Sequence, residues 1–202
     1  MNSKLAIKQL LAIRKLIRGN DIRLAASWPE NWQILISTIL SPQTRDETTI
    51  LVCEDLFSEY PSIEALSLAR IKSIEKIIRR VNYHKTKAKH VSLTCKMLSS
   101  EEIPKDIDSL LKFPGVGRKV ANVYLTEAHN FPAIGVDTHV KRISYKLGWT
   151  NSQNTLIIEK DLKKLFPKRY WRKINDNLVR FGKSFGLSRK KEDEILENLI
   201  NS

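Results

Sequence analysis

The chain has 202 residues, and its 35 Lys and Arg against 22 Asp and Glu give a formal net charge of +13 at pH 7. A chain of this length can bury a hydrophobic core, and no apolar run approaches the roughly 20 residues needed to cross a bilayer, so we expect no integral membrane protein. The sequence pI near 9.8 favours a polyanionic partner, because a strongly basic domain is typical of nucleic-acid binding.

Helical periodicity runs through almost the whole chain. Apolar residues recur three and four positions apart, and strand-like alternation never persists, so the pattern predicts an all-α protein of roughly ten short helices. Most of the seven prolines fall between the apolar stretches, where helices are expected to begin or end. In chain order, these stretches lie at residues 1–20, 32–40, 50–57, 71–78, 88–98, 120–128, 140–147, 156–166, 171–181 and 195–200.

The two cysteines, Cys53 and Cys95, each lie in an apolar helical pattern, which predicts buried thiols. Two distant cysteines provide neither a disulfide framework nor the spacing of a Cys-rich zinc or iron–sulfur site, and the four histidines are scattered. We therefore expect no metal or redox cofactor.

One short stretch interrupts the helical pattern. Residues 110–125 read LLKFPGVGRKVANVYL, so that Pro114, Gly115, Val116 and Gly117 stand between two apolar helical runs. Glycines in such a turn allow a positive φ and a close approach of another backbone. The turn can therefore serve tight helix packing, or its N–H groups can face a phosphate at the start of the second helix, and the net charge favours the phosphate.

Together with GVDTHVKR at residues 135–142, this stretch resembles the helix-hairpin-helix DNA glycosylases, and most closely the endonuclease III family. Weaker similarity covers most of the chain, including ILSPQTRD at residues 39–46 and RRVNYHKTKAKHV at residues 79–91. The resemblance implies a two-domain all-α fold. It implies a six-helix bundle at residues 21–133 that ends in the hairpin, and a second helical domain formed by residues 1–20 and 134–202.

The resemblance also implies a bifunctional DNA glycosylase and abasic-site lyase of base excision repair, acting on double-stranded DNA with a damaged base or an abasic site. Such an enzyme flips the nucleotide out of the duplex and attacks C1′ of its sugar. The implied nucleophile is Lys119, which forms a Schiff base before β-elimination cuts the strand. Lys119 suits this role, because the positive end of a helix dipole and the neighbouring Arg118 both disfavour its ammonium.

Asp137 corresponds to the second catalytic residue of the family. It precedes the apolar stretch at residues 140–147, so it is also expected to cap that helix. A carboxylate at a helix N-terminus can stabilise the positive charge that develops as the glycosidic bond breaks, and it can take part in proton transfer with Lys119. The resemblance places Lys119 and Asp137 on opposite sides of a cleft. His139 is expected to be structural.

Flipping leaves a gap in the base stack, and the family fills it from two loops. The corresponding candidates are Gln43 and, in the second loop, Asn82 and Tyr83, while Pro114, Gly115, Val116, Gly117 and Arg118 are the candidates for DNA contacts of the hairpin. The chain departs from the family here, because SPQTRD and Asn-Tyr stand where the family has Ser-Ala-Gln-Ala-Thr-Asp and Gly-Leu. Two alternatives stay open: Gln43 as a simple turn residue after Pro42, and Tyr83 as a core residue.

The family usually binds a four-iron cluster through four cysteines near the C-terminus, where this chain has none. We therefore expect no cluster, with apolar packing of Phe181, Phe185 and Leu187 in its place. A monomer in the cytoplasm, associated with the nucleoid, is the expected state.

Oxidised pyrimidines are the expected lesions, and the opposite-base preference stays open. The alternatives are an 8-oxoguanine glycosylase-lyase, a mismatch-specific thymine or uracil glycosylase, an adenine glycosylase, and a DNA-binding module without catalysis. The glycosylases for mismatches and for adenine usually lack the lysine.

Overall fold

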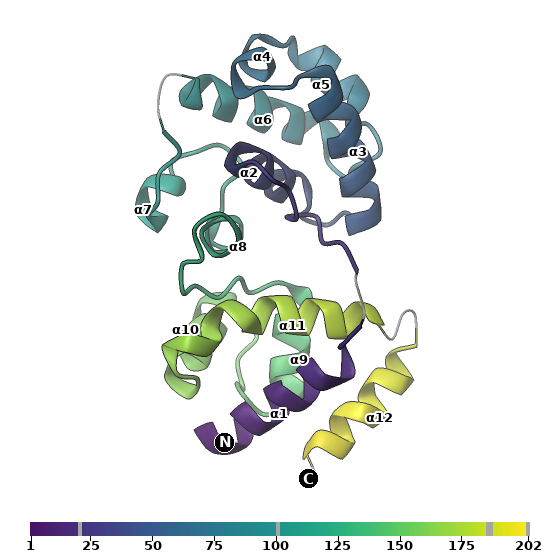
Figure 1. Cartoon of the computed structure of the whole chain (residues 1–202), viewed down its shortest axis with the longest axis vertical. Coiled ribbons are helices and arrows are strands. Elements are labelled where there is room, and N and C mark those ends of the chain that lie inside the picture. The colour runs from purple at the N-terminus through teal and green to yellow at the C-terminus, as the bar shows by residue number, and fades with distance from the viewer. Residues whose placement is uncertain (20–21, 100–101, 185–187, 201–202) are drawn as a thin grey trace. The chain divides into compact units, whose positions relative to one another are not determined.

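A computed structural model describes residues 1–19, 22–99, 102–184 and 188–200. All regular structure within these ranges is helical, which confirms the predicted all-α class (Figure 1). The chain divides into two compact units, residues 23–131 and residues 1–22 with 132–202. The assignment of folding domains at residues 21–133 and at 1–20 with 134–202 stays a prediction, because compactness alone does not show which parts fold independently.

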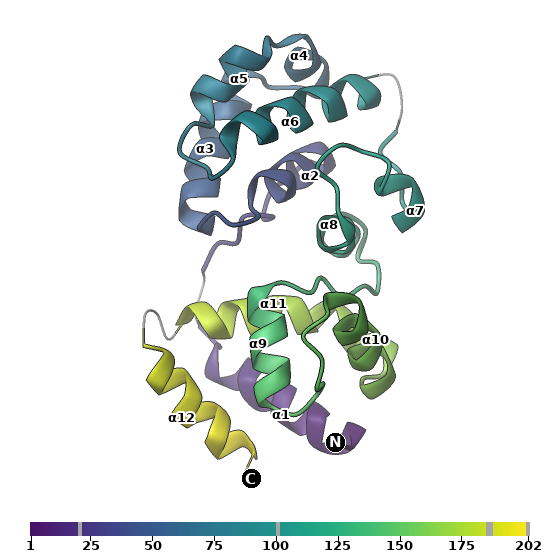
Figure 2. The same ribbon diagram turned by 180° about the vertical axis from the view of Figure 1, so that it is seen from behind.

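The unit of residues 23–131 carries the helices α2 to α8. Their bounds are α2 Asn31–Leu40, α3 Asp46–Glu59, α4 Ile63–Leu68, α5 Ile71–Ile77, α6 His84–Leu98, α7 Ile107–Leu110 and α8 Arg118–His129. Helices α2 and α6 pack against each other in the middle of the unit (Figure 2). The phenyl ring of Phe57 belongs to the core and packs edge-on against both Trp28 and Trp32.

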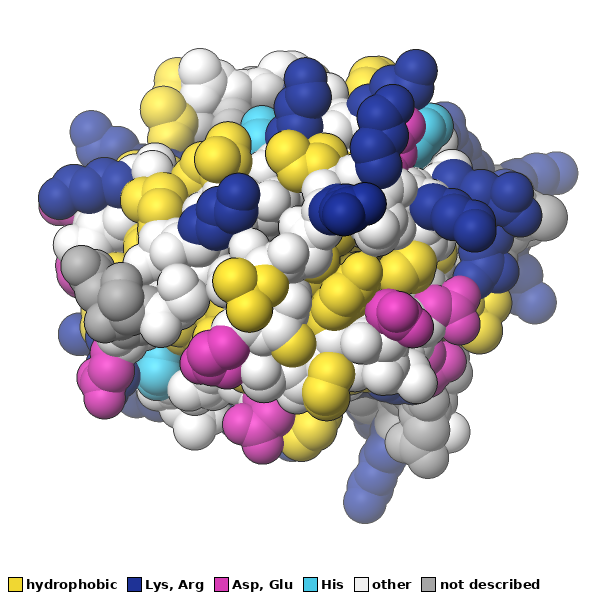
Figure 3. All heavy atoms as spheres, turned by 90° about the horizontal axis from the view of Figure 1, so that it is seen from above, with side chains coloured by type: hydrophobic (Ala, Val, Ile, Leu, Met, Phe, Trp, Pro, Cys, Tyr) yellow, Lys and Arg dark blue, Asp and Glu magenta, His cyan; other side chains and the backbone are white. Residues whose placement is uncertain are grey.

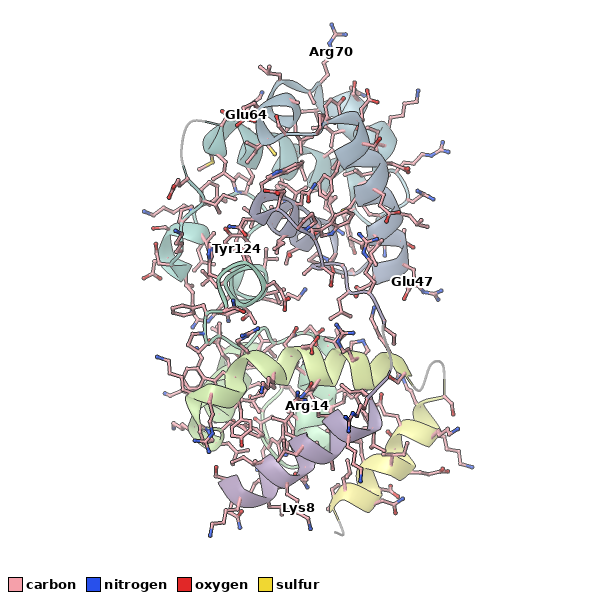
Figure 4. The ribbon with its side chains drawn as sticks, in the orientation of Figure 1. Lys8, Arg14, Glu47, Glu64, Arg70 and Tyr124 are labelled. Carbon is pink, nitrogen blue, oxygen red and sulfur yellow. The ribbon has the colours of Figure 1, made fainter. Side chains whose placement is uncertain are left out.

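Helix α8 shows how burial orders this unit. Its residues from Val120 to Thr126 are buried, and the hydroxyl of the fully buried Tyr124 lies 3.1 Å from Nε2 of His129. Charged side chains such as those of Glu64 and Arg70 extend away from the core (Figure 4). The face at the end of the unit, seen in Figure 3, carries basic, acidic and apolar side chains interspersed.

The second unit contains the remaining helices. They are α1 Ser3–Leu16, α9 Thr138–Lys146, α10 Thr155–Leu165, the 3-10 turn η1 Lys168–Tyr170, α11 Trp171–Ser184 and α12 Arg189–Ile200. Trp149 is central to its core: the ring packs against Phe166, and its indole N–H donates to Gln9 Oε1 at 2.7 Å. The amide of Gln9 in turn donates to the Leu199 carbonyl, so α1 and α12 are held together. None of the helices in the described ranges is long and apolar enough to cross a membrane.

Candidate functional site

The hairpin between α7 and α8 depends on Gly115. This residue has φ +80°, and a Cβ there would stand 2.9 Å from His90 Nδ1 and 3.0 Å from Ile39 Cγ2. The carbonyl of the preceding Pro114 accepts a hydrogen bond from the Thr94 hydroxyl at 2.9 Å. Gly115 is therefore a packing glycine, since both its backbone conformation and its neighbours on α6 and α2 exclude a side chain.

Gly117 differs from Gly115. It has φ −86°, it is exposed, and a Cβ there would meet nothing within 4 Å. Neither strain nor packing requires glycine at this position, which is the N-cap of α8, where glycine is a favoured residue. The side chain of Val116 is buried in the core and its N–H donates to the Phe113 carbonyl at 3.1 Å, whereas Arg118 is exposed.

Lys119 lies in the first turn of α8, as the sequence predicted. The N–H groups of a first helical turn have no intrahelical acceptor, and their partial positive charge opposes an ammonium. The Lys119 side chain is half-buried, and its charge lies close enough to Lys87 to lower the pKa of that residue. Because the repulsion between two charges is mutual, the Lys87 ammonium also disfavours a cation at Lys119.

Asp137 caps α9, which confirms the predicted cap. Its Oδ1 accepts a hydrogen bond from the Val140 N–H at 2.8 Å, and the residue is half-buried. The ring of His139 packs against α11, because a Cβ on Gly182 would stand 2.2 Å from His139 Nδ1. Burial is the main reason that the pKa of His139 lies below its ordinary value, and the charge of Arg142 adds to it. Lys119 and Asp137 belong to different units.

Gln43 occupies a turn between α2 and α3 with a left-handed backbone, φ 58°. It is exposed, while Thr44 beside it is half-buried and donates its N–H to the Ser41 carbonyl. Gln43 is thus a turn residue, and its side chain is also free of the core. A left-handed conformation is uncommon for a residue other than glycine, so the surrounding bonds must hold it.

Asn82 and Tyr83 lie beside this turn. The Asn82 N–H donates to the Thr44 hydroxyl at 3.1 Å, and its side-chain amide donates to the Gln43 carbonyl. Tyr83 also has φ 58°, and it is 64% exposed. The interpretation of Tyr83 as a core residue is therefore wrong: the left-handed turn before α6 carries its ring out of the helix packing. The structure thus brings the two candidate loops together.

Lys87 was not found from the sequence. Its side chain is buried, and its Nζ donates to the Leu40 and Pro42 carbonyls at 2.7 Å each and to Thr44 Oγ1 at 3.2 Å. Burial, with a contribution from the Lys119 charge, lowers the pKa of Lys87 to about 8. The only signal in the sequence is that Lys87 occupies the face of α6 that also carries the buried Val91.

One stripe of α6 organises the whole region. Lys87, His90 and Thr94 follow one another at helical spacing, so they lie on one side of α6, and Tyr83 is the N-cap residue of the same helix. Lys87 holds the turn of Gln43, whereas His90 and Thr94 hold the hairpin at Gly115 and Pro114. A single rigid helix therefore fixes the hairpin, the turn and the exposed ring.

The cysteines do not suit an iron–sulfur cluster of the kind the family carries. Cys53 and Cys95 are both free and buried, as predicted, and both lie in the unit of residues 23–131. Burial raises the pKa of the Cys95 thiol to about 12, and it raises that of Cys53 further. Two such thiols cannot supply four thiolates near the C-terminus. Phe181 is buried as expected, whereas Phe185 and Leu187 lie outside the described residues.

The unit of residues 23–131 carries a glycine hairpin, a lysine in the first turn of the helix that follows it, and two loops joined by a hydrogen bond. These features are typical of the helix-hairpin-helix DNA glycosylases. The comparison with known families agrees. The chain belongs to the HhH-GPD superfamily of base excision DNA repair proteins, whose model matches residues 36–168.

Within that superfamily the chain is similar to endonuclease III. It is 36% identical over 189 residues to endonuclease III of Synechocystis sp., covering 92% of this chain and 85% of that protein. It is 37% identical over 155 residues to endonuclease III of Thermotoga maritima, covering 75% of this chain and 73% of that protein.

Solved structures lead to the same group. A non-covalent endonuclease III–DNA complex matches with a TM-score of 0.88 and 30% identity, covering 98% of this chain and 95% of that one. A trapped endonuclease III–DNA covalent intermediate matches with a TM-score of 0.83 and 31% identity, covering 91% and 87%.

Proposed function

We propose that this protein is a bifunctional DNA glycosylase and abasic-site lyase of base excision repair, with Lys119 as its nucleophile. The observation that carries the proposal is the lysine in the first turn of the helix that follows the glycine hairpin. The similarity to endonuclease III supports both the reaction and the substrate, double-stranded DNA with a damaged base. The net charge of +13 suits a polyanionic duplex.

In the proposed reaction, the neutral amine of Lys119 forms a bond to C1′ of the extruded nucleotide. The glycosidic bond breaks, and the base leaves with the bonding electron pair and gains a proton. Opening of the sugar ring then produces a Schiff base between C1′ and Nζ. Loss of a C2′ proton breaks the bond between C3′ and its oxygen, which cuts the strand, and water releases the lysine.

The chain favours the neutral amine in two ways. The N-terminal end of α8 carries the positive end of the helix dipole, and the positive charges of Arg118 and Lys87 lie nearby. We propose that Asp137 faces the sugar when DNA is bound. Its carboxylate would stabilise the positive charge that develops at C1′ and accept the proton that Lys119 loses.

We propose that oxidised pyrimidines are the substrates. Gln43 and Tyr83 would enter the gap left by the flipped nucleotide, because both are exposed and lie on the two joined loops. The hairpin of Pro114, Gly115, Val116 and Gly117, with Arg118, would contact the phosphates beside the lesion. The tyrosine ring can stack on a base rather than wedge as leucine does.

We also propose that the enzyme works as a monomer without an iron–sulfur cluster, in the compartment that holds the nucleoid. The cysteine count supports the absence of a cluster, since four thiolates are needed and the sequence has two. Iron and sulfide analysis of the purified protein checks the cluster, and sedimentation checks the monomer. Stoichiometric iron, or a stable dimer, would contradict these two points.

Borohydride trapping on abasic-site DNA tests the mechanism. The native chain should form a covalent adduct and Lys119→Ala none, while Lys96→Ala, which removes an exposed charge on α6, should trap normally. A set of duplexes with single lesions identifies the substrate: thymine glycol, 8-oxoguanine, uracil and an abasic site. Release of 8-oxoguanine alone would overturn the lesion class, and trapping by Lys119→Ala would overturn the nucleophile. A DNA-binding module would give no adduct at all.

A further inference from the structure

The turn at residues 41–44 is held by a charge from inside the protein. The carbonyl of Leu40, the last residue of α2, and the carbonyl of Pro42 in the turn both accept from the buried ammonium of Lys87. An ammonium has three donors, and the third bond goes to Thr44 Oγ1. Lys87 is therefore saturated by a single turn of the chain.

Thr44 links the turn of Gln43 to the loop of Asn82 and Tyr83. Its hydroxyl oxygen accepts from Lys87 Nζ and also from the Asn82 N–H at 3.1 Å. The Asn82 side chain closes the arrangement by donating to the Gln43 carbonyl. The turn of Gln43 and the loop of Asn82 and Tyr83 are thus one hydrogen-bonded body around the Lys87 ammonium.

Both exposed tips of this body have an unfavourable backbone conformation. Gln43 and Tyr83 each have φ 58°, which costs free energy for side chains with a Cβ and persists only where the surroundings impose it. Lys87 contacts the first loop directly and stands four residues after Tyr83 on the same helix. It is the one buried charge among the described residues that joins the two tips.

We propose that Lys87 is a positioning residue that holds Gln43 and Tyr83 as a single preformed wedge for the gap left by a flipped nucleotide. The inference rests on the proposed function, in which these two residues fill the base stack. A preformed wedge avoids ordering two loops when the nucleotide flips, so its loss should slow reaction only where a stack must be filled.

Lys87→Met tests this proposal, because methionine has a similar length and lacks the donors. Lys89→Met is the matched control, since Lys89 is an exposed lysine on the same helix. Single-turnover base release is measured on a thymine glycol duplex and on the same strand without its complement. Lys87→Met should slow release from the duplex on the order of 100-fold and leave the single strand nearly unchanged. An equal loss on both substrates would overturn the proposal.

A double-mutant cycle separates positioning from general damage. If Lys87 acts through Gln43, the variant with both Lys87→Met and Gln43→Ala should be no slower on the duplex than the slower single variant. Multiplying losses would contradict the proposal. Should Lys87→Met fail to fold, Thr44→Val removes the hydroxyl between the two loops and keeps the ammonium, and the same duplex-specific loss is expected.

Hydrogen exchange keeps the test separate from the proposed function. Amides of residues 41–45 and 82–83 should exchange faster in Lys87→Met than in Lys89→Met, with or without any base release. Unchanged exchange would overturn the positioning role even in an active glycosylase. Faster exchange in a protein that releases no base and forms no adduct would instead overturn the proposed function and leave the positioning role standing.

Discussion

Arg142 and Glu192 form a two-pronged ion pair between α9 and α12. The guanidinium Nε and Nη2 donate to the two carboxylate oxygens at 2.9 and 2.8 Å, and the Glu192 side chain is only 4% exposed. Lys146 and Asp193 add a second ion pair between the same helices. Two ion pairs therefore hold α12 against α9. The two buried cysteines of the chain cannot bind an iron–sulfur cluster of the four-thiolate kind.

Removing Glu192 should destabilise the protein. Glu192→Ala leaves the Arg142 guanidinium half-buried without its carboxylate, and we expect a loss of about 2 kcal/mol or more in the free energy of unfolding. Glu194→Ala, an exposed carboxylate on the same helix, should change it by less than about 0.5 kcal/mol. Urea denaturation measures both, and equal losses would contradict a special role for the pair.

Alanine at the two glycines of the hairpin should have different effects, one on stability and the other on DNA binding. Gly115→Ala forces a Cβ into a positive φ and against His90 and Ile39, so we expect a loss of roughly 2 kcal/mol or more in stability. Gly117→Ala meets open space but changes the N-cap of α8, so stability should fall by no more than about 1 kcal/mol while the affinity for duplex DNA falls. Thermal unfolding and DNA titration measure the two effects. Full DNA affinity in Gly117→Ala would remove the phosphate contact from this position.

Gly182 should be sensitive to a single methyl group. Its absent Cβ would lie 2.2 Å from His139 Nδ1 and 3.2 Å from an Arg142 nitrogen, so Gly182→Ala is expected to cost about 2 kcal/mol. In a His139→Ala background most of that cost should disappear, because the obstructing ring is gone. Thermal unfolding of the four proteins of this cycle gives the coupling, and additive losses would argue against the contact.

The stability conferred by Lys87 should depend on pH. Its pKa is lowered from 10.5 to about 8, so between these values the unfolded chain retains a proton that the folded chain has released. The free energy of unfolding therefore rises with pH in this window. From about pH 8 to about pH 10.5 the free energy of unfolding should rise more for the native chain than for Lys87→Met. Lys89→Met should show the same pH dependence as the native chain. Denaturant unfolding across this range measures the difference, and parallel curves for all three would contradict it.

Periodicity was enough to place most helices, because burial of one face repeats every 3.6 residues and leaves a pattern in the sequence. Helix α4 was not predicted, since its six residues are too few for that pattern and its signal is a single cap, the Ser62 hydroxyl that accepts from Ala65. The cap at Asp137 and the position of Lys119 in its helix followed from local motifs. These features depend on neighbours in sequence, which is why they were predictable.

The features that were missed depend on distant parts of the chain. A lysine in a basic sequence reads as a surface charge, and Lys87 is buried because carbonyls 47 and 45 residues away surround it. Gln43 and Tyr83 have a left-handed backbone that the sequence does not indicate, because neither residue is glycine. The separate roles of Gly115 and Gly117 likewise follow only from what stands opposite each one.

Lys87, His90 and Thr94 lie on one side of α6 and keep their relative positions only at a fixed helix length. One inserted residue between Lys87 and His90 would rotate everything beyond it by about 100° and advance it by about 1.5 Å. The hairpin would then lose its contacts with His90 and Thr94, while the turn of Gln43 would keep its hydrogen bonds to Lys87. This segment should therefore tolerate changes of residue type far better than changes of length.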